Sequence, residues 1–291
     1  MQTWDRPQVR IVSSSSVQVH HFGPQAVARA IPGGDVPIFV TQVETPDGSI
    51  ALTQEDFPVD GIAGIPHDAL LIFGGDASAA IVITVPVNTA LVVASVGRGS
   101  LRVENYHSAM VLLLHNGGID VSNSSGAAYV QAARGSIAVA NSNFDRIRAR
   151  TAIGNIFFTG CNVRQVEVSS VRGHIAYDNG TFAPGLARFE TQEGNIALGV
   201  ASGGVHVTAH ASGGRVVSGL ERNAGTVAGS PTDAEATING GGPIVTANAG
   251  KGSIFIYSGT LRGKPRIERQ LPRAPRAPFK AKICVKPRCR V

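Results

Sequence analysis

The chain has 291 residues, of which 43% are hydrophobic and 5% aromatic, and it contains 35 glycines. This length suits one large or two ordinary domains, and the glycine content with few helix-favouring runs favours an all-β protein. The net charge of +6 is uneven: residues 263–291 hold ten Lys or Arg and one acid, whereas residues 1–262 carry a net charge of −3. No run of about 18 apolar residues occurs, which excludes a membrane-spanning helix.

The amino-terminal sequence does not resemble a signal peptide. The three cysteines, Cys161, Cys284 and Cys289, are too few for a disulfide framework and favour a reducing compartment. We therefore expect an intracellular location, in the cytoplasm or an organelle matrix, rather than secretion. The compartment itself stays open.

Residues 1–47 begin with apolar alternation at Val9-Arg10-Ile11 and Val17-Gln18-Val19. This pattern predicts one or two edge strands that cap the first rung of a larger stack. His20 and His21 could ligate a metal, but no other ligand residues cluster near them in the sequence, so we expect no metal site there. Between residues 54 and 75 the pattern is broken by prolines and glycines, which predicts a loop insertion.

One short phrase recurs along most of the chain: glycine, a small polar residue, an aliphatic residue, any residue, and a second aliphatic or aromatic residue. Its first aliphatic position falls at Leu101, Ile119, Ile137, Ile156, Ile175 and Ile196, at intervals of 18 to 21 residues. A near-constant period of this size indicates repeated units stacked in one direction. Within each phrase the alternation predicts a short strand with one buried face.

A second, less uniform set of strands follows each phrase by about ten residues, as in Ala128–Ala132, Ile147–Ala149 and Val166–Val168. Each repeat therefore holds two strands and two turns. We predict an all-β fold: a single-stranded β-solenoid, or β-helix, with two-strand rungs of about 18–21 residues and an extended basic C-terminal tail. Glycines and Asn-Gly pairs would supply the corners.

The strand Ile81–Val85, the following Leu91-x-Val93 and the repeated Gly-polar-Ile-x-Val phrases resemble the adhesin-like, Gly-rich β-solenoid domains, a family of unknown function. The resemblance covers roughly residues 80–258 and implies the fold. It brings no catalytic residues with it. The 54–75 insertion and the basic tail depart from the family's pattern.

Three segments follow from these patterns: N-terminal capping strands in 1–47, the solenoid in 48–262 with its insertion at about 54–75, and a Pro/Arg-rich tail in 263–291. From Gly219 to Gly242 the repeat loosens, and we expect rungs with degenerate corners there. Ile254–Tyr257 is expected to be the last, or capping, strand. Prolines in the tail disfavour helix and favour an extended backbone.

The sequence offers little for catalysis, and we expect no enzymatic activity, no cofactor and no small-molecule ligand. Serine, histidine and acidic residues are present, but no Gly-x-Ser-x-Gly elbow occurs. Cys161 is expected to be a core or corner residue. The one acidic concentration, Glu55 and Asp56 with Asp60 and Asp68, is expected to be a solvated loop, although paired carboxylates serve some polysaccharide-cleaving β-helices. Cys284 and Cys289 could be free, bridged or completed by a partner as a metal site.

The basic tail is the strongest functional signal, because clustered cations neutralise phosphates or carboxylates without sequence readout. The candidate partner-binding residues are Lys264, Arg266, Arg269, Arg273, Arg276, Lys280, Lys282, Lys286, Arg288 and Arg290. The leading hypothesis is a non-catalytic scaffold tied through this tail to protein subunits or a nucleic-acid backbone, as in a ribonucleoprotein. The alternatives are a surface adhesin, suggested by the family and by sequons at Asn123 and Asn179, and a polysaccharide-active enzyme.

Overall fold

The computed structural model describes residues 8–14, 18–22, 27–31, 38–43, 69–74, 80–86, 91–220 and 224–259. Within these ranges the chain forms strands, turns and bends without any helix. Accordingly, the described residues include no helix long and apolar enough to cross a membrane.

The amino-terminal strands are β1 (Gln8–Ser14), β2 (Gln18–Phe22), β3 (Val27–Ile31), β4 (Ile38–Val43), β5 (Ala69–Gly74), β6 (Ala80–Pro86), β7 (Leu91–Glu104) and β8 (Ala109–Ser122). The middle strands are β9 (Ser125–Arg134), β10 (Ile137–Ala140), β11 (Asn143–Ile153), β12 (Ile156–Thr159), β13 (Asn162–Arg172), β14 (Ile175–Phe182), β15 (Ala187–Glu193) and β16 (Ile196–Val200). The last strands are β17 (Val205–Ala211), β18 (Val216–Gly219), β19 (Gly225–Gly229), β20 (Asp233–Ile238), β21 (Ile244–Lys251) and β22 (Ile254–Ser258).

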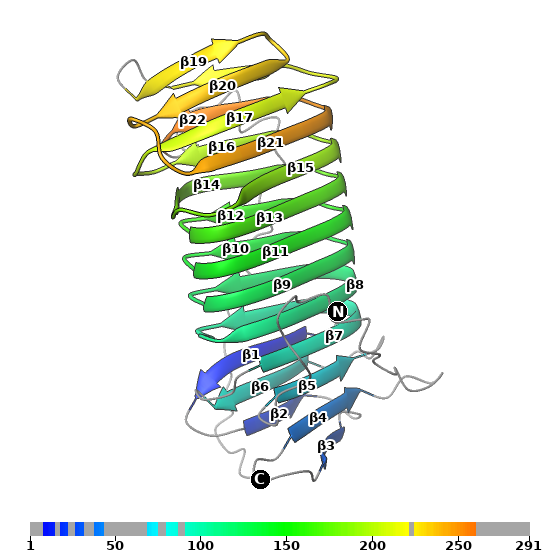
Figure 1. Ribbon diagram of the computed structural model, residues 1–291. Helices are drawn as coiled ribbons and strands as arrows, with labels where there is room; N and C mark the ends of the chain where they lie inside the picture. Colours follow the sequence, from blue (N-terminus) through cyan, green and yellow to red (C-terminus); the bar gives the residue numbers. More distant parts are fainter. Residues whose placement is uncertain are drawn as a thin grey trace, which may run out of the picture.

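These strands stack as a β-solenoid, which confirms the predicted fold (Figure 1). Each regular coil holds a long strand followed by a short one, such as β11 and β12, and every strand pairs in parallel with its counterpart in the next coil. The aliphatic residue of the phrase stacks on its own copies: Ile119 pairs with Ile137, Ile137 with Ile156, Ile156 with Ile175 and Ile175 with Ile196. The coil length therefore equals the sequence interval of 18 to 21 residues.

The core lies between the long-strand layer and the short-strand layer. In β12, for example, Ile156 and Phe158 are almost completely buried in the main core, whereas Phe157 between them points away from it. Burial of such aliphatic and aromatic side chains supplies most of the stabilisation of a thin stacked core. Two smaller apolar clusters form on outward-facing positions, one around Phe157 and Phe255 and the other around Val93 and Tyr129.

One corner of each coil, here named the glycine corner, is formed by stacked glycines: Gly99, Gly117, Gly135, Gly154, Gly173, Gly194 and Gly252. Their φ angles lie between 137° and 156°, a region open essentially to glycine alone. A Cβ atom on Gly154 would lie 1.9 Å from the carbonyl oxygen of Gly135 in the preceding coil. The recurrent glycine is thus required both by its own backbone angle and by the coil beneath it.

The polar residue after each corner glycine also has a structural role. The Asn155 side chain accepts a hydrogen bond from the His174 backbone N–H at 2.8 Å, and His174 Nδ1 accepts one from the Asn195 N–H at 3.0 Å. Asn195 in turn accepts from the Ser253 N–H at 2.8 Å. This polar ladder of Asn155, His174, Asn195 and Ser253 satisfies backbone donors at the turn.

The opposite corner, here named the asparagine corner, is formed by Asn105, Asn123, Asn141, Gly160 and Asn179, with φ angles between 50° and 63°. This left-handed region tolerates asparagine as well as glycine. The next residue points inward: Ser142 Oγ donates to the Ala140 carbonyl at 2.8 Å, and Cys161 stands in the same place one coil on. Cys161 is 2% exposed, which confirms its expected core position.

The upper end of the stack departs from chain order. β21 and β22 stack directly on β15 and β16, and β17 and β18 then stack on β21 and β22. β20 runs antiparallel to β17, and β19 pairs antiparallel with β20 as the outermost strand of the described cap (Figure 1). The expectation that Gly219–Gly242 adds further coils is therefore wrong, because this segment forms an antiparallel hairpin. Ile254–Tyr257 is likewise an internal strand and not a cap.

The lower end also contains an insertion. β1 pairs in parallel with both β6 and β7, so Val9–Ile11 lie within the stack and not at its edge. β2 runs antiparallel along β6, and β3 runs antiparallel along β4. The predicted insertion at about 54–75 lies mostly outside the described residues, except for β5, which pairs with β4 and β7.

Candidate functional site

The basic residues predicted to bind a partner, from Lys264 to Arg290, lie outside the described residues, as do Cys284 and Cys289. The acidic candidates Glu55, Asp56, Asp60 and Asp68 also lie outside them. His20 and His21 fall on β2, opposite Val82 and Ile81 of β6. Where side chains are described, no group of three or more His, Cys, Asp or Glu could hold a metal ion.

Several charged side chains on the long-strand face are paired with one another. Arg148 Nε on β11 lies 2.7 Å from Glu167 Oε2 on β13, and Arg188 pairs with Glu190 on β15 at 2.6 Å. Nearer the glycine corner, Glu193 contacts Lys251 at 3.0 Å and Arg172 at 3.1 Å. Lys251 chiefly, with help from Arg172, lowers the pKa of the Glu193 carboxyl. Such exposed pairs add little stability individually.

Where side chains are described, two shallow grooves lie on the long-strand face. The smaller, about 250 Å³, lies between Arg146, Gln165 and Leu186, where Arg146 Nε donates to Gln165 Oε1 at 2.9 Å. The larger, about 530 Å³, lies near the cap and is lined mainly by polar side chains, with Ser169 and Gln192 on one side and His210 and Ser212 on the other.

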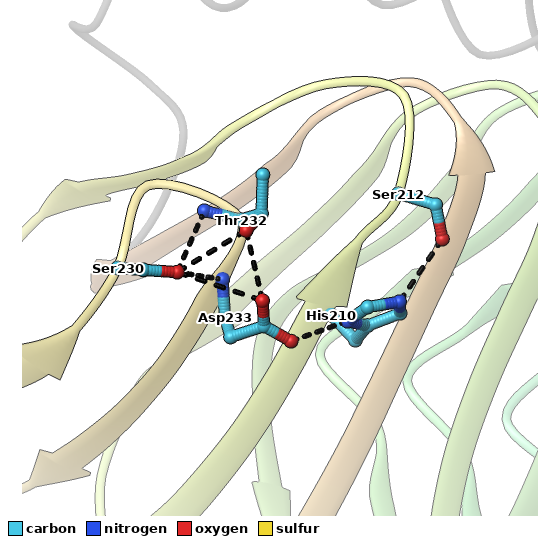
Figure 2. Close-up of polar contacts among 5 residues, drawn as sticks. All are labelled: His210, Ser212, Ser230, Thr232 and Asp233. Carbon is cyan, nitrogen blue, oxygen red and sulfur yellow. Dashed lines mark hydrogen bonds and ion pairs between the residues drawn. The ribbon is translucent and has the colours of Figure 1, made fainter.

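A polar cluster borders the larger groove (Figure 2). His210 on β17 lies between two partners: its Nδ1 contacts Asp233 Oδ1 on β20, and its Nε2 is 3.0 Å from Ser212 Oγ. Asp233 is held in turn by Thr232, whose hydroxyl donates to Oδ2 at 2.8 Å, and by Ser230, whose Oγ accepts from the Asp233 N–H at 2.9 Å. The hydrogen bond from His210 is the main cause that lowers the pKa of Asp233.

Ser212, His210 and Asp233 stand in the order of a serine–histidine–acid relay, but their surroundings differ from those of hydrolases. In such enzymes the acid is buried, so that the relay works at low dielectric. Here the side chains of His210 and Asp233 are 52% and 62% exposed, and water competes for each hydrogen bond. These contacts tie the turn before β20 to the outer side of β17.

Sequence reasoning missed this cluster, because His210 and Asp233 are 23 residues apart and meet only through the antiparallel return of β20. The one available signal is the segment Ser230-Pro231-Thr232-Asp233, whose residue types are typical of a tight turn. A hairpin predicted there would have paired β20 with β19, but it would not have placed Asp233 beside β17.

Comparison with known proteins leaves the family open. No protein family matches the chain, and no curated protein does. One solved structure, described as a "putative cell adhesion protein" from Clostridium sporogenes ATCC 15579, matches at a TM-score of 0.26 and 10% identity, covering 87% of this chain and 93% of that one. A likeness of this strength carries no inference about function. The adhesin-like resemblance seen in the sequence therefore stays an expectation about the fold.

Proposed function

We propose that the protein is a non-catalytic structural and interaction protein. Its β-solenoid is a rigid scaffold, and its basic C-terminal tail docks onto an acidic partner, as a subunit of a large assembly such as a ribonucleoprotein. The observation that carries the proposal is the division of charge, a net of −3 in residues 1–262 against +9 in residues 263–291.

Several arginines of the described solenoid pair with acids of neighbouring strands, as Arg148 does with Glu167 and Arg172 does with Glu193. A cation beside a carboxylate exerts less long-range attraction on a polyanion than an unpaired one. In the tail, by contrast, ten basic residues accompany one acid, which suits phosphate-rich nucleic acid first and acidic protein second.

The test is a binding titration of single-stranded RNA and of polyglutamate, followed by fluorescence anisotropy at two salt concentrations. We compare the full chain with a chain ending at residue 262 and with a full-length variant whose ten tail Lys and Arg residues are changed to Gln. The full chain should bind RNA with an affinity that falls steeply with salt, because cations on the tail release condensed counterions. Both variants should lose this binding.

The two variants separate charge from chain length. Binding that survives in both variants would refute docking through the tail. Binding of polyglutamate as tight as that of RNA would refute the ribonucleoprotein assignment and favour an acidic protein partner. A pull-down from cell extract with and without nuclease then shows whether the same preference holds in the native mixture.

A further inference from the structure

The short strands present an outer face that carries apolar side chains. We name as the short-strand face the outward positions Phe157, Ala176, Ala197, Phe255 and Tyr257, which form one cluster separate from the main core. They alternate along β12, β14, β16 and β22 with residues that point into the core. Because these strands are stacked neighbours, the five side chains form one continuous patch.

This patch is far less exposed than an outer face should be. Ala197 and Tyr257 are 0% exposed, and Phe157 and Phe255 are each 8% exposed. Elsewhere on the outside of the solenoid, Leu186 and Ile244 are 54% and 62% exposed. Every described strand belongs to the two ladders of the stack, so no described strand forms a third layer over the patch. We conclude that a further segment packs on it.

Acidic side chains border the same face. Tyr257 lies across Gly199, where a Cβ atom would fall 2.2 Å from its ring, and its hydroxyl donates to Asp178 Oδ1 at 3.2 Å. Further down the stack, Asp120 occupies the outward position in register with Ala138 and lies 3.8 Å from Arg102, and partial burial raises its pKa. The segment that covers this face therefore meets an apolar strip bordered by carboxylates.

The chain itself leads onto this face. β22 ends at Ser258, Gly259 donates its N–H to the Val200 carbonyl at 2.8 Å, and the chain continues from residue 260 into the basic tail of 263–291. Residues 260–279 carry Leu261, Ile267 and Leu271 among basic residues. The five steps from β22 to β8 span about 24 Å at the usual strand spacing, which about eight extended residues cover. By contrast, the segment between β4 and β5 is attached at the other end of the stack.

We propose that residues 260–279 lie along the short-strand face as a strap. Leu261, Ile267 and Leu271 pack over the apolar patch, and the intervening Lys and Arg residues face the carboxylates of Asp178 and Asp120. Prolines at 265 and 272 suit this arrangement, because they favour an extended backbone that needs no internal hydrogen bonds. The strap leaves Lys280 to Arg290 for the acidic partner. The strap goes beyond the proposed function, which requires only that the tail bind an acidic partner.

The experiment places the photo-cross-linker p-benzoylphenylalanine at Phe255 in the full-length protein, one aromatic side chain replacing another. After irradiation of the monomeric fraction, mass spectrometry identifies the joined peptides. We expect an intramolecular link between position 255 and a peptide from residues 260–279, with a yield independent of protein concentration. The matched control carries the cross-linker at Gln131 on the exposed side of β9 and should give no link to the tail.

Other outcomes overturn the strap. A link from position 255 to residues 44–68, a link only between two copies of the chain, or no link at all would each refute it. The proposed function is judged separately, by RNA binding of the same protein. A tail that binds RNA without cross-linking refutes the strap alone, whereas a cross-linked tail that binds no RNA or acidic polymer refutes the docking function alone.

Discussion

Both corners of each coil turn the chain between a long strand and a short one, but the backbone is constrained differently at each. At the glycine corner the backbone adopts φ angles near 150°, and the carbonyl oxygen of the coil below occupies the place of a Cβ atom. At the asparagine corner φ is near 50°, where asparagine and glycine both fit. Accordingly, every position of the glycine corner is Gly, whereas the asparagine corner holds Asn at four positions and Gly at one.

This difference shows what the recurrent phrase specifies. Repetition of a glycine followed by a polar residue marks a place where two coils contact through their backbones, and where the polar side chain accepts the next coil's N–H. A residue that repeats in this way is required by the stacking of one coil on the next. Variation at the asparagine corner reflects a looser constraint. Substitutions at each corner can therefore measure the two constraints separately.

The largest effect is expected at the glycine corner. Changing Gly154 to Ala should lower the free energy of unfolding by more than about 3 kcal/mol, because it combines backbone strain with a clash against the Gly135 carbonyl. Gly203→Ala is the matched control: its φ is also positive, at 76°, but a Cβ atom there meets nothing within 4 Å. Urea denaturation should show a much smaller loss for the control. Equal losses would assign the effect to strain alone.

An intermediate effect is expected at the asparagine corner. Asn141→Ala should cost about 1–2 kcal/mol, the usual penalty for a left-handed residue without glycine or asparagine. Asn141→Gly should change the free energy of unfolding by less than about 0.5 kcal/mol, because Gly160 already fills this place one coil on. If the glycine variant were as unstable as the alanine variant, the asparagine side chain itself would be essential and the corners would be equally strict.

The smallest effect is a pH dependence in the polar ladder. His174 Nδ1 accepts the Asn195 N–H, which requires a neutral ring, and burial lowers the pKa of His174 below its usual 6.5. The unfolded chain therefore binds a proton more readily. The contribution of His174 should be fully present above about pH 6.5 and be lost as pH falls toward its folded-state pKa.

The control variant for this titration is His174→Asn. It places at position 174 the residue type that stands at the equivalent positions 155 and 195 of the neighbouring coils. Thermal unfolding between pH 8 and pH 5 should show a steeper loss of stability in the wild type than in this variant. Parallel curves would show that protonation of His174 does not disturb the glycine corner.

Much of the fold follows from the sequence, because the strictest constraints repeat locally. The interval between Ile137 and Ile156 predicts the register between β10 and β12 directly, and the alternation within each phrase predicts which side chains enter the core. The order of the coils at the cap cannot be predicted from the sequence in the same way. Gly214 and Gly252 both stack on a glycine of another coil, so the local sequence does not indicate which of them lies directly on Gly194.

The candidate sites were less predictable for two physical reasons. The polar cluster of His210 and Asp233 depends on an antiparallel return, and sequence distance alone does not reveal which strand β20 will join. The covered patch around Phe157 depends on the outward positions, which the alternation identifies as outward but cannot identify as buried. The charge of the tail, by contrast, is visible in the sequence without any fold.

The inserted coil at the cap has a consequence for the order in which the protein forms. Strands β8 to β16 can stack one after another as the chain leaves the ribosome, since each pairs with a strand already made. β17 and β18 cannot take their final places until β21 and β22, made later, lie beneath them. The final 58-residue interval, from Ile196 to Ile254, should therefore assemble as one late cooperative unit, slower than the coils below it. Until then, the upper edges of β15 and β16 stay open to mispairing.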